Sequence, residues 1–248
     1  MRIKLSPELA EILGMFAADG CLQSRYACMW GNINQDKEYY DNVVCPLFSK
    51  VFKNKVIAHE KKSNSVYGFY LCGKDVVAFF EKFGFNIGKK TYNVEVPRLI
   101  LESNNSILYS SFIRGFTDCD GCINFLRRAT GKYSHFKKNY HTYPRIFIKS
   151  TSNNVIQGIS NMLSELDIQH SLEKQSVENS KKGKGEVFST VIRGTTRLDK
   201  WMNLIGFNNP VQQSKYDIWK KYSFCPANTT FSQRKKILNG KLNPLSFY

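Results

Sequence analysis

Two aspartates are the side chains of this 248-residue sequence best suited to metal-dependent chemistry. Asp19 and Asp120 each close a short apolar segment that ends in Asp-Gly, and the segments align without a gap, so that Gly14 corresponds to Gly115. Carboxylates held side by side repel one another unless a cation joins them, and hard cations such as Mg²⁺ prefer these oxygen ligands. The repeated segment therefore predicts a metal site with two carboxylates.

Each aspartate needs a helix to position it. A glycine inside a helix costs about 1 kcal/mol relative to alanine, so Gly14 and Gly115 indicate that two helices pack at very short distance. The terminal Gly20 and Gly121 suit the left-handed residue that ends many helices, which would place the aspartates in the last turn. That end is the negative pole of the helix dipole, which strengthens the need for a cation.

The composition indicates a polyanionic partner. The chain carries 36 Lys and Arg against 20 Asp and Glu, a net charge of +16, as in proteins that bind nucleic acid. A membrane is not expected, because no apolar run approaches the roughly 20 residues that span a bilayer. The sequence Ser6-Pro7-Glu8 predicts a helix start where a secretory signal would lie.

The cysteines favour an intracellular protein with free thiols. There are seven, an odd number, scattered along the chain, which does not suggest a disulfide framework. Cys119 and Cys122 form a CxxC, but no second pair or nearby histidine pair accompanies it. Zinc is therefore not expected there.

The predicted elements also repeat. After the first motif we expect a strand, a helix, two strands and a helix at residues 21–31, 34–52, 55–61, 66–72 and 74–83. After the second we expect strands, helix, strands and helix at residues 122–128, 143–150, 153–166, 168–177, 187–193 and 195–205. In segment 21–31, alternation puts Gln23 and Arg25 on a polar face and Leu22, Tyr26 and Trp30 on an apolar face toward a helix layer. The sequence thus predicts an internal duplication.

The paired segments resemble the double motif of single-chain LAGLIDADG homing endonucleases, with residues 12–20 and 113–121 at the nine motif positions. The resemblance implies an α+β fold of two pseudo-symmetric αββαββα repeats packed through the motif helices, each with an antiparallel saddle-like sheet that faces DNA. The first copy departs from the family at Ala17, where many members carry an acid, whereas the second keeps Asp118. The departure is expected to affect packing rather than chemistry.

The resemblance divides the chain into four parts. It implies a first repeat at 1–86, a linker at 87–105 and a second repeat at 106–222. Residues 223–248 form a basic C-terminal tail, which either clamps phosphates or is solvated.

The activity implied by the resemblance is that of a monomeric, site-specific double-strand DNA endonuclease. It would hydrolyse both strands across the minor groove of a long pseudo-palindromic target with Mg²⁺, for which Mn²⁺ or Ca²⁺ can substitute, leave short 3′ overhangs and promote intron mobility. Asp19 and Asp120 would hold the metal with the carbonyls of Ala18 and Cys119. Catalysis would also use Lys90, Lys215, Asn32 and Ser150, the lysines ordering water and stabilising charge near the scissile phosphate.

Recognition is expected from the sheet faces and from two basic hairpin tips. The candidates in the first sheet are Gln23, Arg25, Lys61 and Tyr70, and those in the second are Arg127, Arg145, Lys149, Lys174 and Arg193. The tips contribute Lys137, Lys138, Lys181 and Lys182. Any one of these charges could instead be a solvated edge residue that blocks sheet aggregation.

Two alternatives remain at this point: an intron RNA maturase or RNA-binding protein of the same fold, and a cleavage-dead DNA-binding protein. The presence of both Asp19 and Asp120 argues for retained cleavage. An intein-embedded nuclease is not expected, because no splicing domain surrounds the motifs. The protein is expected with host DNA, either in an archaeal cytoplasm or in an organelle matrix.

Overall fold

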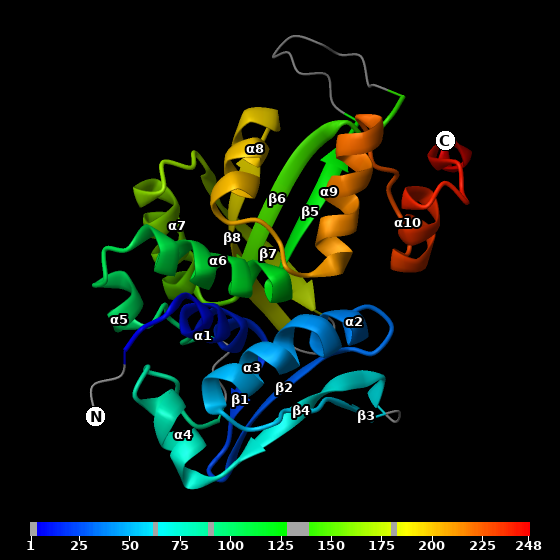
Figure 1. Ribbon diagram of the computed structural model, residues 1–248. Coiled ribbons are helices and arrows are strands. Elements are labelled where there is room, and N and C mark those ends of the chain that lie inside the picture. The colour runs from blue at the N-terminus through cyan, green and yellow to red at the C-terminus, as the bar shows by residue number, and fades with distance from the viewer. Residues whose placement is uncertain (1–3, 62–63, 89–91, 128–138, 180–182) are drawn as a thin grey trace.

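The two copies of the motif form the pair of helices at the centre of the molecule. Helices α1 (Pro7–Asp19) and α6 (Ser106–Asp120) lie side by side, with one repeat on each side of the pair. Ser6 starts α1, because its Oγ accepts a hydrogen bond from the Leu9 N–H at 3.2 Å. Figure 1 shows the computed structural model, which describes residues 4–61, 64–88, 92–127, 139–179 and 183–248.

Both repeats have the αββαββα order that the resemblance implies, although the first repeat has two strands where one was predicted over residues 21–31. The first continues with β1 (Gly20–Leu22), β2 (Tyr26–Asn32), α2 (Lys37–Tyr39), the π-helical η1 (Tyr40–Val44), α3 (Cys45–Phe52), β3 (His59–Lys61), β4 (Val66–Cys72) and α4 (Lys74–Glu81). The second continues with β5 (Gly121–Leu126), β6 (Tyr143–Ser150), α7 (Asn153–Glu165), β7 (Ser171–Asn179), β8 (Gly183–Arg193) and α8 (Thr195–Leu204). This confirms the α+β fold class of two αββαββα repeats.

Each repeat contributes one antiparallel sheet of four strands. The strand orders are β1-β2-β4-β3 and β5-β6-β8-β7, which are equivalent under the duplication. Helices α7 and α8 cover one face of the second sheet, where Ile146 and Ile148 are fully buried. The opposite face of each sheet, which we call its open face, carries the more exposed side chains.

The segment predicted as one strand over residues 21–31 is a hairpin. Strands β1 and β2 pair antiparallel with Cys21 opposite Cys28, and the Gln23 N–H donates to the Tyr26 carbonyl at 2.8 Å to close the turn. The turn residues break the alternation that a continuous strand would have kept. Side chains beyond the turn therefore fall on different faces from those predicted.

The faces predicted for Tyr26 and Trp30 on β2 are wrong for this reason. Met29 lies opposite Phe69 and both are buried, and the Phe69 ring is 5.0 Å from that of Phe48 on α3. Strand alternation puts Tyr26 and Trp30 on the other face. These two aromatics, expected against the helix layer, lie on the open face instead.

Two further parts of the chain have more structure than predicted. The linker contains a one-turn helix, α5 (Arg98–Leu101), and the buried side chains Val94 and Val96. After α8 come α9 (Pro210–Tyr222), α10 (Phe231–Leu238) and the 3₁₀ turn η3 (Pro244–Phe247). Helix α10 packs on α9 through buried Ile237 and Arg234, so the basic C-terminal segment is a folded part of the second repeat's side of the molecule.

No helix within the described residues combines the length and the apolar character needed to cross a membrane. All seven cysteines lie in the described part of the chain, and each is a free thiol.

Candidate active site

The close approach of α1 and α6 depends on one glycine from each helix. A Cβ added to Gly14 would lie 2.1 Å from the carbonyl oxygen of Phe112, and one added to Gly115 would lie 2.1 Å from that of Glu11. Both distances are far below van der Waals contact, and the obstacles are backbone atoms. The helix pair therefore has its present separation only with glycine at both positions.

The glycines that follow the two aspartates have a different role from the predicted left-handed cap. Gly20 has φ −68° and Gly121 has φ −106°, so both are in the extended region and lead directly into β1 and β5. A Cβ on Gly20 would lie 2.2 Å from the Phe16 ring, and one on Gly121 would lie 2.4 Å from Thr117 Cγ2. Glycine is required at both positions because any larger residue would collide with Phe16 or Thr117. The expectation of a left-handed residue is wrong.

Asp19 and Asp120 close the two helices, and both act on the partly buried thiol of Cys119. The side chain of Cys119 hydrogen-bonds Asp19 of the other repeat. Burial raises the pKa of the Cys119 thiol well above its usual value, and the negative charges of Asp19 and Asp120 raise it further. Cys119 therefore stays protonated and donates to a carboxylate across the boundary between the repeats.

A cavity of about 360 Å³ opens beside Asp120. Ser150, predicted to complete the second catalytic site, lines it together with Lys149 and with Ala17 and Ala18 of the first motif. A carboxylate, a hydroxyl and an ammonium group thus face the same hollow at the junction of the repeats. The lysine and the hydroxyl suit a phosphate group, and the carboxylate would repel that group unless a cation joined them.

The other predicted catalytic side chains lie in different surroundings. Lys215 on α9 places its Nζ 3.3 Å from Cys122 Sγ and 3.2 Å from Gln212 Oε1. It lines a larger cavity, of about 980 Å³, shared with the C-terminal segment. Asn32 uses its side-chain oxygen to accept the N–H groups of residues 34 and 35 in a turn. Lys90 lies outside the described residues.

The donor set fits a Mg²⁺ ion that shares its coordination with a substrate. Within the described residues, no group of three or more His, Cys, Asp or Glu side chains could hold a metal ion by itself. Mg²⁺ in phosphate chemistry is commonly bound by one or two carboxylates, with waters and substrate phosphates as the remaining ligands. Asp19 and Asp120 lie at adjacent helix ends and meet that requirement, and Asp120 also lines the hollow with Lys149 and Ser150.

A buried polar network beneath the acids was missed by the sequence reasoning. Asp118 Oδ2 accepts the backbone N–H groups of Asn208 at 2.8 Å and Asn209 at 3.1 Å. Arg114 pairs with Glu11 of the other motif helix at 2.6 Å, and Asn208 Nδ2 donates to Glu11 at 2.6 Å. The network ties both motif helices to the start of α9, which carries Lys215.

The network explains the role of the extra acid in the second motif. Burial raises the pKa of Asp118 strongly, while the two backbone N–H donors act in the opposite direction. Ala17 has no such group, so the loop after α4 is attached differently, by the Gly88 N–H donating to the Leu22 carbonyl at 2.9 Å. The only sequence signal for this contact is the Gly-Phe-Asn triplet that follows the last helix of each repeat.

Asn209→Ala should lower the free energy of unfolding by about 1–2 kcal/mol. Buried Asn209 caps α9 through its Oδ1, which accepts the Val211 N–H at 2.9 Å, and donates from Nδ2 to the Asp118 carbonyl at 2.9 Å. Asn243→Ala is the matched control, because Asn243 makes the same cap contact with Leu245 at an exposed site. Urea unfolding should show a larger loss of unfolding free energy for Asn209→Ala than for Asn243→Ala. Equal losses would mean that the Asp118 contact contributes nothing.

The residues predicted to contact DNA divide between the two faces of the sheets. On the open face of the second sheet, Arg145 lies opposite Arg193 and beside Asn124, whose Oδ1 accepts from Arg145 Nε at 3.3 Å. Lys149 is on the same face by alternation. Lys174 lies on the opposite face, opposite Phe188, and pairs with Glu186 at 2.6 Å. This placement separates it from the other candidates.

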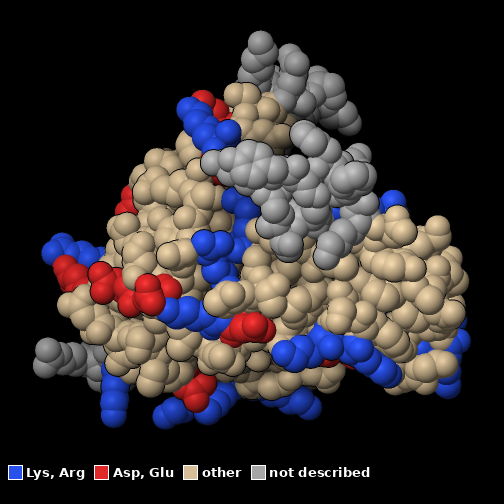
Figure 2. Space-filling view, turned by 90° about the horizontal axis from the view of Figure 1, so that it is seen from above, with Lys and Arg blue, Asp and Glu red and all other residues tan. Residues whose placement is uncertain are grey.

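The remaining candidates lie at strand ends and turns. Gln23 and Arg25 occupy the turn between β1 and β2, Lys61 and Tyr70 lie on the open face of the first sheet, and Arg127 follows β5. Figure 2 shows Lys and Arg side chains in several separate groups over the upper side of the molecule, with acidic groups between them. Four predicted tip residues lie outside the described residues: Lys137, Lys138, Lys181 and Lys182.

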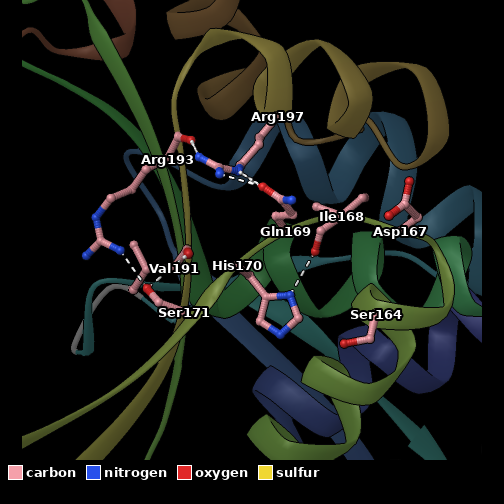
Figure 3. Close-up of a pocket in the computed structure, with 9 residues that line it drawn as sticks. All are labelled: Ser164, Asp167, Ile168, Gln169, His170, Ser171, Val191, Arg193 and Arg197. Atoms are coloured by element: carbon pink, nitrogen blue, oxygen red, sulfur yellow. Dashed lines mark hydrogen bonds between the residues drawn. The ribbon is translucent and has the colours of Figure 1, made fainter. Parts of the chain in front are cut away.

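A separate hollow of about 620 Å³ lies where β7 begins (Figure 3). Arg193 donates to Ser171 Oγ at 2.6 Å and pairs with Glu173, while Arg197 donates to Gln169 Oε1 at 2.6 Å. None of its lining residues lines the hollow beside Asp120. Its arginines are held by groups of the protein itself.

The chain matches known proteins through the motif and through the fold. A family model for the LAGLIDADG-like domain matches residues 108–206. The chain is 25% identical over 196 residues to an A-type ATP synthase subunit from Pyrococcus abyssi, covering 79% of this chain and 16% of that protein. It is 30% identical over 116 residues to the replication factor C small subunit of Methanocaldococcus jannaschii, covering 47% and 6%. This chain thus spans less than a fifth of either relative.

The solved structures of the homing endonuclease I-DmoI have a similar fold. One of them superposes with a TM-score of 0.50 at 13% identity, covering 80% of this chain and 90% of that one. The crystal structure of I-DmoI with DNA and Ca has the same TM-score and identity, covering 80% and 88%. At this identity the likeness concerns the fold alone.

Proposed function

This chain belongs to the LAGLIDADG family, with both motif helices on one polypeptide, and we propose that it is a monomeric, site-specific DNA endonuclease. One observation carries the proposal: each motif helix ends in an aspartate, and both aspartates act on the same thiol, that of Cys119, at the junction of the repeats. A protein that only binds DNA would have no need for paired carboxylates where the DNA phosphates are expected to lie. The +16 charge adds electrostatic attraction to duplex DNA.

The residues of the site would have separate roles in the hydrolysis. A divalent metal bound at Asp19 and Asp120 would supply Lewis-acid stabilisation of the phosphate and a more acidic water. Cys119 orients the Asp19 carboxylate through its thiol. Lys149 and Ser150 line the hollow beside Asp120 and would hold the scissile phosphate of one strand by charge and hydrogen bonding. Solved I-DmoI–DNA complexes, one with Ca and one in the presence of Mn, support the use of a divalent ion.

The positions of Asp19 and Asp120 predict the kind of DNA end that cleavage would leave. With one carboxylate from each repeat, the protein would reach phosphates on opposite strands where they approach across the minor groove. We therefore expect staggered cuts that leave short 3′ overhangs. Such a break at an uninterrupted copy of the target would promote mobility of an intron that carries this reading frame.

The test is selection of a cleaved sequence from a plasmid library with a randomised insert. In MgCl₂ the protein should convert a small subset of plasmids to linear DNA with one defined site, and EDTA should abolish the cut. Sequencing of the ends gives the overhang. The proposal fails if no sequence is preferred, or if cutting persists unchanged in EDTA.

A further inference from the structure

The open face of the first sheet carries an aromatic cluster in place of a set of polar side chains. Four rings form the cluster: Tyr26 and Trp30 on β2, His59 on β3 and Tyr70 on β4. Trp30 lies opposite Gly68, which lies opposite His59. Because Gly68 has no side chain, the Trp30 ring reaches across it. The cluster thus spans three strands.

The rings are locked against one another. The Trp30 ring is 5.0 Å from Tyr70 and 5.2 Å from His59, both edge to face, and Tyr26 is 5.1 Å from Tyr70 in the same manner. Lys61 donates to the Tyr70 hydroxyl, and its Nζ lies 4.2 Å above the Trp30 ring and 4.6 Å from the Tyr70 ring. His59 is exposed, and the other three rings are half-buried. The surface is therefore rigid, largely apolar and open to a partner.

The two sheets differ in what they offer to a base pair. The second sheet places Asn124, Arg145 and Lys149 on its open face, all able to hydrogen-bond base edges. In the first sheet, Lys61 is engaged by Tyr70, and Gln23 Nε2 donates to Cys21 Sγ at 3.2 Å. The same duplication thus produces one face with charged and amide side chains and one face on which aromatic rings predominate.

We propose that the aromatic cluster of Tyr26, Trp30, His59 and Tyr70 recognises thymine in one half of the DNA target through the thymine methyl groups. The inference rests on the proposed function. The C5-methyl of thymine is the apolar group that base edges present in the major groove, and it is a natural partner for an apolar protein surface. The Lys61 ammonium adds the positive charge that a polyanionic partner requires.

The ring geometry favours a duplex over unpaired bases. Stacking an unpaired base requires a free aromatic face. Here Lys61 lies over Trp30 and Tyr70, and edge-to-face contacts join Trp30 to both His59 and Tyr70. Methyl groups in the major groove can pack on the outer surface of these rings without moving them, whereas an unpaired base that stacks would have to displace a ring or Lys61.

The experiment compares thymine with uracil, which lacks only the methyl group. A preferred duplex is first selected from a random-sequence duplex library, and its thymines are then replaced by deoxyuridine in one half at a time. The unaltered protein should lose about fourfold in affinity for each buried methyl, and only in one half. Trp30→Ala should bind the thymine and uracil duplexes alike, whereas Arg145→Ala, on the second sheet, should keep the difference.

The possible failures are distinguishable. If the selected duplex is bound and cut but uracil substitution in either half has no effect on the unaltered protein, the inference is overturned and the proposed function stands. The inference also fails if Trp30→Ala keeps the full methyl dependence, or if single strands bind more tightly than the duplex. If no duplex is enriched at all, the proposed function fails and the inference with it.

Discussion

Asp19→Asn and Asp120→Asn should each reduce the cleavage rate at least a hundredfold while leaving the fold and the DNA affinity largely intact. A hundredfold corresponds to about 2.7 kcal/mol of transition-state stabilisation, within the several kcal/mol that a correctly held metal supplies. Asparagine has nearly the same shape as aspartate but carries no charge to bind the metal. At position 19 its carbonyl oxygen can still accept the Cys119 thiol, so the local packing is preserved.

The measurement is single-turnover cleavage of a plasmid carrying the selected site, with affinity measured separately in Ca²⁺. Asp75→Asn is the matched control, because Asp75 is an exposed aspartate on α4. That variant should cut at the parental rate. Parental cutting of both strands by either motif variant would show that the carboxylates are not the metal ligands.

Gly14→Ala and Gly115→Ala should each destabilise the protein by about 3 kcal/mol or more. Overpacking a core commonly costs about 1–3 kcal/mol when side chains can adjust. Here the added Cβ would lie 2.1 Å from a backbone carbonyl oxygen of the partner helix, which cannot rotate away. The two helices would have to separate along their whole contact, and leucine at either position should prevent folding.

Thermal unfolding checks this expectation. For a chain of this size, 3 kcal/mol corresponds to a fall in Tm of roughly 6–12 °C. Gly185→Ala provides the control, since a Cβ at Gly185 meets nothing within 4 Å; its Tm should change by no more than about 3 °C. An unchanged Tm for Gly14→Ala would contradict the close helix packing.

Local sequence was sufficient to predict the central part of this protein. The duplicated segment, with a glycine in mid-helix and an aspartate at the end, depends on contacts within one helix and between two helices of the same pattern. The N-cap residues Ser6 and Asn105 act on N–H groups two or three residues away. For the same reason, most helices and strands of the two repeats could be predicted from periodicity, although the β1–β2 hairpin was predicted as one strand.

Tertiary structure decided the orientation of β2 and the conformation of Gly20, because each depends on one turn or one contact that periodicity does not reveal. One turn at residues 23–25 reverses which side of β2 faces the helices. The alternation of polar and apolar residues does not predict such a reversal. The turn moves Trp30 from an expected core position to the open face. Gly20 was predicted to be left-handed because it follows a helix, but its backbone is extended where β1 begins, and the Phe16 ring beside it leaves no room for a side chain.

The buried network depends on contacts across 90 or more residues. Asp118 binds the backbone of Asn208 and Asn209, and Glu11 binds Arg114 and Asn208. Nothing in the spacing of these residues identifies them as partners, because their separation reflects the path of the chain around a whole repeat. The sequence by itself determined that two carboxylates meet at a helix pair. Which side chains surround them, and which face of each sheet is open, follows from packing, because burial in one repeat is completed by residues of the other.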